Sequence, residues 1–132
     1  MNAWDWHLLR ANPFLVRLIG GGLRKPKNKI LGAAIAERVE AVGKNVGRYQ
    51  PGDEVFGDLA NQGGGGFADY ACAREDALAL KPANTTFQEA AAVPMAAVTA
   101  LQGLRDKGQI QPGQKVLMNG ASGGVGVGCQ RK

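Results

Sequence analysis

The sequence contains few cysteines, a single histidine and no long apolar run. Two cysteines, Cys72 and Cys129, do not make the disulfide framework of a small secreted domain, so a reducing compartment is the simpler interpretation. A membrane-spanning helix needs about 18 or more consecutive apolar residues, and no such run occurs. The chain also starts without the basic and apolar regions of a signal peptide. We therefore expect a soluble, cytoplasmic protein with no membrane partner.

The sequence also contains few of the residues that most often bind zinc, with one histidine and two cysteines. A catalytic tetrahedral zinc takes about three protein ligands from Cys, His, Asp or Glu, and a structural site of the four-cysteine type needs more cysteines than the two present; we recognise neither set in the sequence. We therefore predict no metal site. Cys72 falls inside an alternating segment that predicts a strand, which favours a small buried hydrophobic residue over a ligand or a nucleophile.

Charge gives only a weak indication of partners. The net charge of +5 would attract anions, but only Arg24, Lys25, Lys27 and Lys29 form a run, which Pro26 interrupts. No aromatic residues interleave with this run, so a solvated loop is favoured over a nucleic-acid site. With 45% apolar and 20% charged residues, the composition is that of a folded chain of one domain, or of one domain and part of another.

The first part of the chain reads as β-rich. Residues 30–42 alternate in a way that predicts extended structure ending at a turn around Lys44. Pro51-Gly52-Asp53 is typical of a turn, and Val55 then begins another strand. We predict further strands over residues 67–72, after the four glycines of Gly63–Gly66, and over residues 78–80. Asp53 is interpreted as a turn residue rather than a base.

Helices are predicted at three places. Asn12 and Pro13 have the pattern of an N-cap and a first helical residue, with a short helix to Ile19. Thr86-Phe87-Gln88-Glu89 fits a capping box before an alanine-rich helix, which Pro94 should break or restart. Residues 95–107 then form another helical pattern, with Gly108 at its end.

The most informative feature is a glycine-rich turn near the end of the chain. Residues 115–119 form a short apolar run that suits a buried parallel strand, and Gly120-Ala121-Ser122-Gly123-Gly124-Val125-Gly126 follows directly. Backbone N–H groups at such a turn can face a pyrophosphate. The spacing differs from the strict G-x-G-x-x-G pattern, so taken alone it fits a phosphate cradle and an ordinary strand-to-helix turn equally well.

Several short segments together carry a resemblance. They are Pro51-Gly52-Asp53-Glu54-Val55-Phe56-Gly57, Gly65-Gly66-Phe67-Ala68-Asp69-Tyr70, Ala90-Ala91-Ala92-Val93-Pro94, Thr99-Ala100 and the glycine-rich turn. In this order they resemble the zinc-independent quinone oxidoreductase branch of the medium-chain dehydrogenase/reductase family. The resemblance implies a partial, β-rich GroES-like barrel over residues 1–93. It implies a connecting helix with the first strand and glycine turn of a Rossmann α/β domain over residues 94–132.

The resemblance also implies an activity and the residues that serve it. The activity is NAD(P)H-dependent reduction of a quinone or enone by hydride transfer without zinc, with NADP as the expected cofactor and NAD as the other possibility. The residues implied at the cofactor are Thr99, Gly120, Ser122, Gly123, Gly124, Val125 and Gly126. Asn2 and His7 would lie near the nicotinamide and substrate, although a lone histidine more often has no catalytic role. Asp5 matches a structural acid, and the full-length protein would be a homodimer.

The sequence also departs from the family pattern. Ala34 stands where an acid is expected and Glu37 where a glycine is expected, which puts the local packing in doubt. Strands expected before Asn2 and the sheet expected after Gly126 are not in the sequence. A Rossmann unit with one strand cannot enclose a dinucleotide. We therefore expect a truncated member of the family that does not turn over substrate alone, and a non-catalytic binding or interaction module is the alternative.

Overall fold

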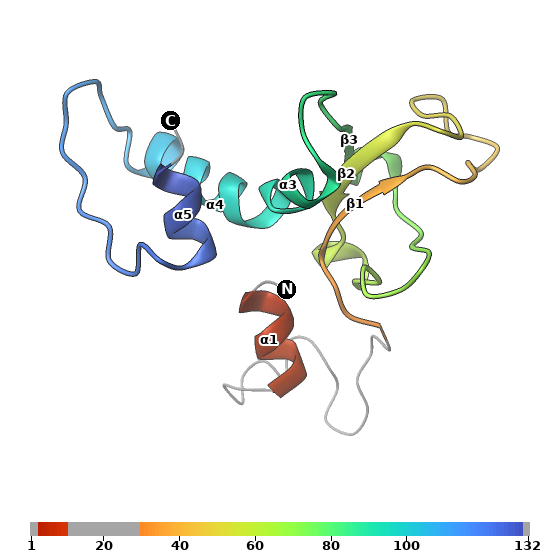
Figure 1. The fold of residues 1–132 in the computed structure, drawn as a ribbon, viewed down its shortest axis with the longest axis horizontal. Helices are drawn as coiled ribbons and strands as arrows, with labels where there is room; N and C mark the ends of the chain where they lie inside the picture. Colours follow the sequence, from red (N-terminus) through yellow and green to blue (C-terminus); the bar gives the residue numbers. More distant parts are fainter. Residues whose placement is uncertain (1–2, 11–29, 131–132) are drawn as a thin grey trace.

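The computed structural model describes residues 3–10 and 30–130 of the chain. Three predictions lie outside these residues: the role of Asn2, the helix from Asn12 to Ile19, and the basic run of residues 24–29. In Figure 1 the strands lie at the right with α3 beside them, α4 and α5 follow to the left, and α1 lies below.

The β-rich half contains one three-stranded antiparallel sheet in the order β1-β2-β3. Its strands are β1 (Ala34–Arg38), β2 (Glu54–Asp58) and β3 (Leu78–Leu80). Along β2 every second residue is buried, as expected for a strand with one face on a core. This confirms the extended segments predicted around residues 30–42, 55–57 and 78–80. The sheet is open rather than closed into a barrel within the residues that the structure describes.

Backbone pairing continues beyond the strands into the turns that join them. Val39 donates to the carbonyl of Asp53 at 2.8 Å, and Gly52 donates to the carbonyl of Val39 at 2.8 Å. The Asp53 carboxylate accepts the N–H of Gln50 at 2.9 Å, which confirms Asp53 as a turn residue. Glu37 lies on β1 opposite Val55, so the strand forms despite the residue that departs from the family pattern.

The strand predicted over residues 67–72 is wrong. Gly66 and Phe67 donate to the carbonyls of Gly32 and Leu31 at 2.9 Å each, but after Phe67 the chain bends away without joining the sheet. Cys72 is consequently exposed rather than buried. Alternation of apolar and polar residues predicts a strand only where a neighbouring strand offers its N–H and C=O groups.

The helical half is one continuous helical path whose winding changes along its length. It consists of α3 (Phe87–Ala91), the π-wound η3 (Val93–Ala97), α4 (Val98–Leu101) and the π-wound η4 (Gln102–Lys107). The capping box at Thr86 is present as predicted. Pro94 lies in the first turn of η3, where its missing N–H breaks no helical hydrogen bond, so the path restarts there. Gly108 ends the path in a right-handed conformation.

The strand predicted over residues 115–119 is also wrong. Residues 114–118 form no strand, and Leu117 is 98% exposed. A parallel strand exists only when another strand pairs with it, and none does so among the described residues. The glycine-rich turn after it nevertheless leads into a helix, α5 (Gly124–Gln130), which packs against η3 and α4.

Three short elements complete the described fold: η1 (Ala60–Gln62), η2 (Glu75–Ala77) and α1 (Ala3–Arg10). Asp5 of α1 is 2% exposed and its carboxylate accepts the N–H of Ala33 at 3.2 Å, which ties α1 to the segment before β1. The structural role expected for Asp5 is thereby confirmed. Among the described residues, the buried apolar side chains are Ala33, Ile35, Tyr49, Val55, Leu59, Ala90 and Ala100.

Candidate functional site

The candidate site is the glycine-rich turn and the beginning of α5. The N–H of Gly123 donates to the carbonyl of Gly120 at 3.0 Å and closes the turn. Gly120 has a φ of +75°, a left-handed conformation that favours glycine. The N–H of Val127 then donates to the carbonyl of Gly123 at 2.9 Å, which begins the helical pattern. The turn therefore passes directly into α5.

Gly126 fixes how closely the helix approaches the turn that precedes it. A Cβ placed on Gly126 would lie 2.6 Å from the Cα of Ala121 and 2.7 Å from its carbonyl carbon. Backbone atoms cannot move aside as a flexible side chain can, so only glycine fits here. The third glycine of a dinucleotide-binding turn has this same function of permitting close packing.

Small residues also bring α5 close to the preceding helices. A Cβ on Gly128 would lie 3.3 Å from the Cα of Ala97, and one on Gly124 would lie 3.7 Å from the Cβ of Ala96. The glycine-rich turn is thus held in place because α5, which follows it, packs against η3 and α4. Ser122, Gly123 and Gly124 remain exposed at its surface.

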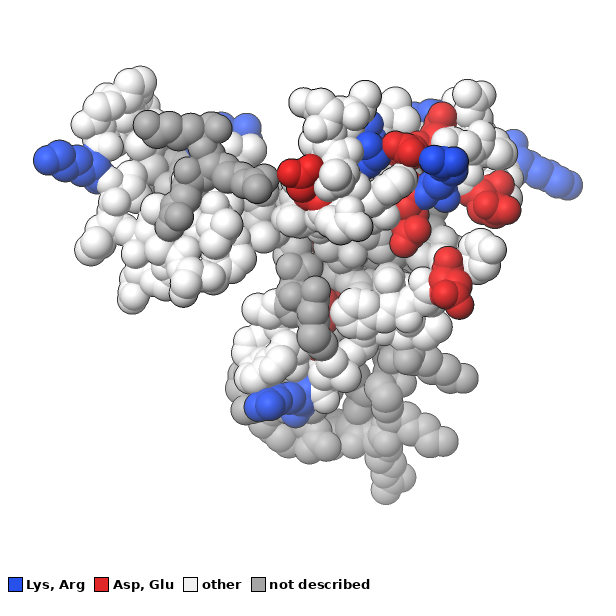
Figure 2. Space-filling model, in the orientation of Figure 1, with Lys and Arg blue, Asp and Glu red and all other residues white. Residues whose placement is uncertain are grey.

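The electrostatics of this region suit an anion. The first N–H groups of a helix have no partner within the helix and carry a partial positive charge. After Asp106 the sequence contains no aspartate or glutamate, whereas Lys107, Lys115, Arg131 and Lys132 are basic. In Figure 2 the acidic side chains gather over the sheet, and none lies over α4 and α5 on the visible face. These features fit the pyrophosphate of a dinucleotide.

Thr99 lies on α4, which packs against α5, and its side chain is exposed. Its hydroxyl Oγ1 donates to the carbonyl of Met95 at 2.6 Å, one turn back along the path. This hydrogen bond fixes the hydroxyl against η3, where the π winding loosens the usual backbone ladder. The structure therefore brings Thr99 and the glycine turn onto two neighbouring helices.

His7 is not brought to the glycine turn. It lies on α1, half-buried, with its ring edge-on to Trp6 at a centroid distance of 5.1 Å. No extensive packing joins α1 to α5 among the described residues, and Asn2 lies outside them.

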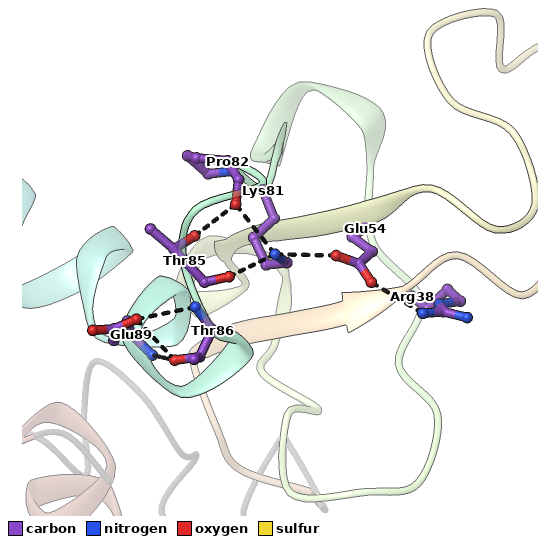
Figure 3. A network of polar contacts seen from close by, with 7 residues as sticks. All are labelled: Arg38, Glu54, Lys81, Pro82, Thr85, Thr86 and Glu89. Carbon is purple, nitrogen blue, oxygen red and sulfur yellow. Dashed lines mark hydrogen bonds and ion pairs between the residues drawn. The ribbon is translucent and has the colours of Figure 1, made fainter.

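A polar network at the sheet was not anticipated from the sequence. Figure 3 shows the Lys81 ammonium directed at Glu54 and at the carbonyls of Pro82 and Thr85. Hydrogen bonds from Lys81, and secondly from Arg38, hold the pKa of the Glu54 carboxyl below its ordinary value. The network joins β1, β2 and the residue that follows β3 to the segment that begins α3. No local spacing signals it, because Arg38, Glu54 and Lys81 are far apart in sequence.

No group of three or more His, Cys, Asp or Glu side chains that could hold a metal ion occurs among residues 3–10 and 30–130. In the same part of the chain no helix has both the length and the apolar character needed to cross a membrane.

Comparison with known proteins gives consistent relationships. Residues 1–83 match the family model of the alcohol dehydrogenase GroES-like domain. A chloroplast envelope quinone oxidoreductase homolog from Arabidopsis thaliana is 35% identical, with 96% of this chain and 38% of that protein covered. A 2-methylene-furan-3-one reductase from Solanum lycopersicum is 38% identical, with 76% of this chain and 27% of that protein covered. The chain thus spans well under half the length of these relatives.

Solved structures agree. An alcohol dehydrogenase superfamily protein from Novosphingobium aromaticivorans superposes with a TM-score of 0.79 at 35% identity, with 98% of this chain and 38% of that chain covered. A mycobacterial protein complexed with NADPH superposes with a TM-score of 0.67 at 28% identity over 74% of this chain and 30% of that one. Because the family model matches more than half of the sequence, this chain belongs to the alcohol dehydrogenase GroES-like domain family, in the quinone oxidoreductase-like branch of the medium-chain dehydrogenase/reductases.

Proposed function

We propose that this chain is part of an NADPH-dependent oxidoreductase that reduces quinones or enones. The observation that carries the proposal is the glycine-rich turn, where Gly126 lies against Ala121 so closely that no side chain fits. The names of the relatives, a quinone oxidoreductase homolog and a furanone reductase, supply the substrate class. We place the boundary between the GroES-like domain and the nucleotide-binding segment at residues 93 and 94.

Each residue of the proposed site has a distinct role. The backbone from Gly120 through Ser122, Gly123, Gly124 and Val125 to Gly126 would surround the pyrophosphate with N–H groups. Thr99, on the neighbouring helix, would lie beside the nicotinamide ribose. Asn2 and His7 would serve the substrate end. When bound, the nicotinamide supplies the hydride, and the role of the chain is to bind and orient it against the substrate.

NADPH is preferred over NADH in this proposal because a structural neighbour is complexed with NADPH. The proposed hydride transfer takes place without zinc, as the resemblance to the zinc-independent branch of the family implies. A homodimer of the full-length protein belongs to the same proposal and is tested by its mass in solution.

The test is a titration of the 132-residue chain with NADPH and NADH, followed by fluorescence of the reduced nicotinamide. Weak but saturable binding of both nucleotides is expected, because the glycine-rich turn would contact the pyrophosphate that they share while one strand does not enclose the rest of the dinucleotide. Absence of saturable binding of either nucleotide would overturn the proposal for this site. Turnover is measured separately, as oxidation of NADPH in the presence of a quinone and of an enone.

The second candidate is a non-catalytic binding module. The observation in its favour is the exposed segment before the glycine turn, where Leu117 is 98% exposed. This candidate predicts association that depends on protein concentration, with nucleotide binding but no oxidation of NADPH. Oxidation of NADPH that depends on the quinone and on the chain would exclude it.

A further inference from the structure

Asn119 directly precedes the glycine-rich turn and forms an asparagine-glycine pair with Gly120. Asn119 is the only asparagine in the sequence that glycine follows. Asparagine is a thermally labile residue, and a following glycine leaves the backbone nitrogen without a neighbouring side chain to shield it. We propose that Asn119 is a site of spontaneous deamidation, which places a negative charge directly before the glycine-rich turn.

The local structure leaves this reaction unhindered. Asn119 and Gly120 are both exposed, and a Cβ added to Gly120 would meet no atom within 4 Å. Among the described residues no hydrogen bond holds the Asn119 carboxamide. The turn therefore permits the side chain to approach the backbone nitrogen of Gly120.

The step balances within the chain and one water molecule. The Gly120 nitrogen loses its proton and forms a bond to Cγ of Asn119, and the amide leaves as ammonia after protonation. The product is a five-membered succinimide. Water then adds to one of its two carbonyl carbons and opens the ring to aspartate or isoaspartate. No oxidant, metal or enzyme is needed, and the rate rises with pH because the attacking nitrogen must lose its proton.

The consequence follows from the charge around residue 119. No acidic residue lies between Asp106 and Lys132, so the new carboxylate would be the first in this segment. Isoaspartate would also lengthen the backbone directly before Gly120, whose carbonyl closes the turn to Gly123 at 3.0 Å. Under the proposed function, on which this consequence rests, the added negative charge repels the pyrophosphate. Deamidation would therefore weaken nucleotide binding.

The chemical step is tested without any nucleotide. The purified chain is incubated at neutral and alkaline pH, digested, and its peptides are analysed by mass spectrometry with separation of aspartate from isoaspartate. Conversion is expected at Asn119, faster at the higher pH, and not at Asn61 or Asn84, which glutamine and threonine follow. Asn119→Gln is the matched variant, because its longer side chain disfavours the five-membered ring. An Asn119 that converts no faster than Asn61 and Asn84 would overturn the proposal.

The functional consequence is tested on the same material. Asn119→Asp is expected to bind NADPH about fivefold more weakly than Asn119→Gln, the effect of one charge at a few ångströms in water. NADPH is expected to slow the conversion of the unmodified chain. If conversion occurs but NADPH neither binds nor protects, the proposed function fails and the deamidation site stands. If NADPH binds and Asn119 stays intact at both pH values, the proposed function stands and the deamidation site fails.

Discussion

The Lys81 ammonium lies 3.0 Å from the Glu54 carboxylate, and the Lys81 side chain is only 5% exposed. The same ammonium donates to the carbonyl of Thr85 at 2.7 Å and to that of Pro82 at 3.2 Å. Glu54 in turn accepts from Arg38 of β1 at 3.0 Å. A single buried cation thus connects the sheet to the segment that begins the helical path (Figure 3).

We expect Lys81→Met to destabilise the fold. The substitution keeps the apolar part of the side chain but leaves the half-buried Thr85 carbonyl without its Lys81 donor, and a fully buried acceptor left in this way would cost about 1–3 kcal/mol. The measurement is the free energy of unfolding in urea. Arg38→Met is the matched control, since the Arg38 side chain is 65% exposed and an exposed ion pair contributes little. Equal losses in the two variants would contradict the central role of Lys81.

The free energy of unfolding should also change with pH in the acid range, because Glu54 becomes protonated there. Hydrogen bonds from Lys81 and then Arg38 lower the pKa of Glu54 in the folded chain from its ordinary value of 4.5. The stabilisation is therefore complete above pH 4.5 and is lost as the pH falls through the lower folded-state pKa. Unfolding of the original chain and of Glu54→Gln, measured across this range, should converge at the acid end. A difference that stays constant with pH would argue against the ion pair.

The Thr86 capping box should contribute measurably to α3. Its hydroxyl accepts the N–H of Glu89 at 3.2 Å, while the Glu89 carboxylate accepts the N–H of Thr86 at 3.0 Å. Thr86→Ala should lower the free energy of unfolding by about 1 kcal/mol, because an N-terminal donor loses its acceptor. Thr86→Ser keeps the hydroxyl and should retain most of the stability. An equal loss in both variants would mean that the methyl group, not the cap, matters.

Gly32 should tolerate alanine less well than Gly52. Their φ angles are +99° and +97°, so alanine meets the same left-handed strain at both, about 1–2 kcal/mol. A Cβ on Gly32 would also lie 2.6 Å from the nitrogen of Phe67, whereas a Cβ on Gly52 would meet nothing within 4 Å. The difference in unfolding free energy between the two variants isolates this contact. Equal free energies of unfolding in the two variants would show that the loop at Phe67 moves away from the added Cβ without loss of stability.

Gly126 should be essential for nucleotide binding. Gly126→Ala places a Cβ against the Ala121 backbone and should move α5 away from the turn. Affinity for NADPH is then expected to fall, measured by fluorescence titration. Gly103→Ala, on η4 with nothing within 4 Å of the added Cβ, is the control for substituting a helical glycine. Unchanged affinity in Gly126→Ala, with α5 retained by circular dichroism, would contradict the proposed cradle.

The sequence by itself determined the elements whose causes are local. The turn at Pro51-Gly52-Asp53 and the capping box at Thr86 each form because neighbouring residues satisfy one another's backbone groups. The strand around Val55 was predictable because its period-two pattern matches a sheet with one buried face. The glycine-rich turn was also recognisable, since its glycines follow one another within a few residues.

Only the tertiary structure decided the features that need a distant partner. Residues 67–72 and 115–119 both have strand-like patterns, yet neither segment forms a ladder with a neighbouring strand among the described residues, so neither is a strand and Cys72 is exposed. Asp5 became a buried acceptor because Ala33 offers its N–H from elsewhere in the chain. Lys81 joined Glu54 and Thr85 because the fold places them around one site. A local pattern records which conformations a segment favours, whereas long-range hydrogen bonds and burial depend on which surfaces the rest of the chain brings to it.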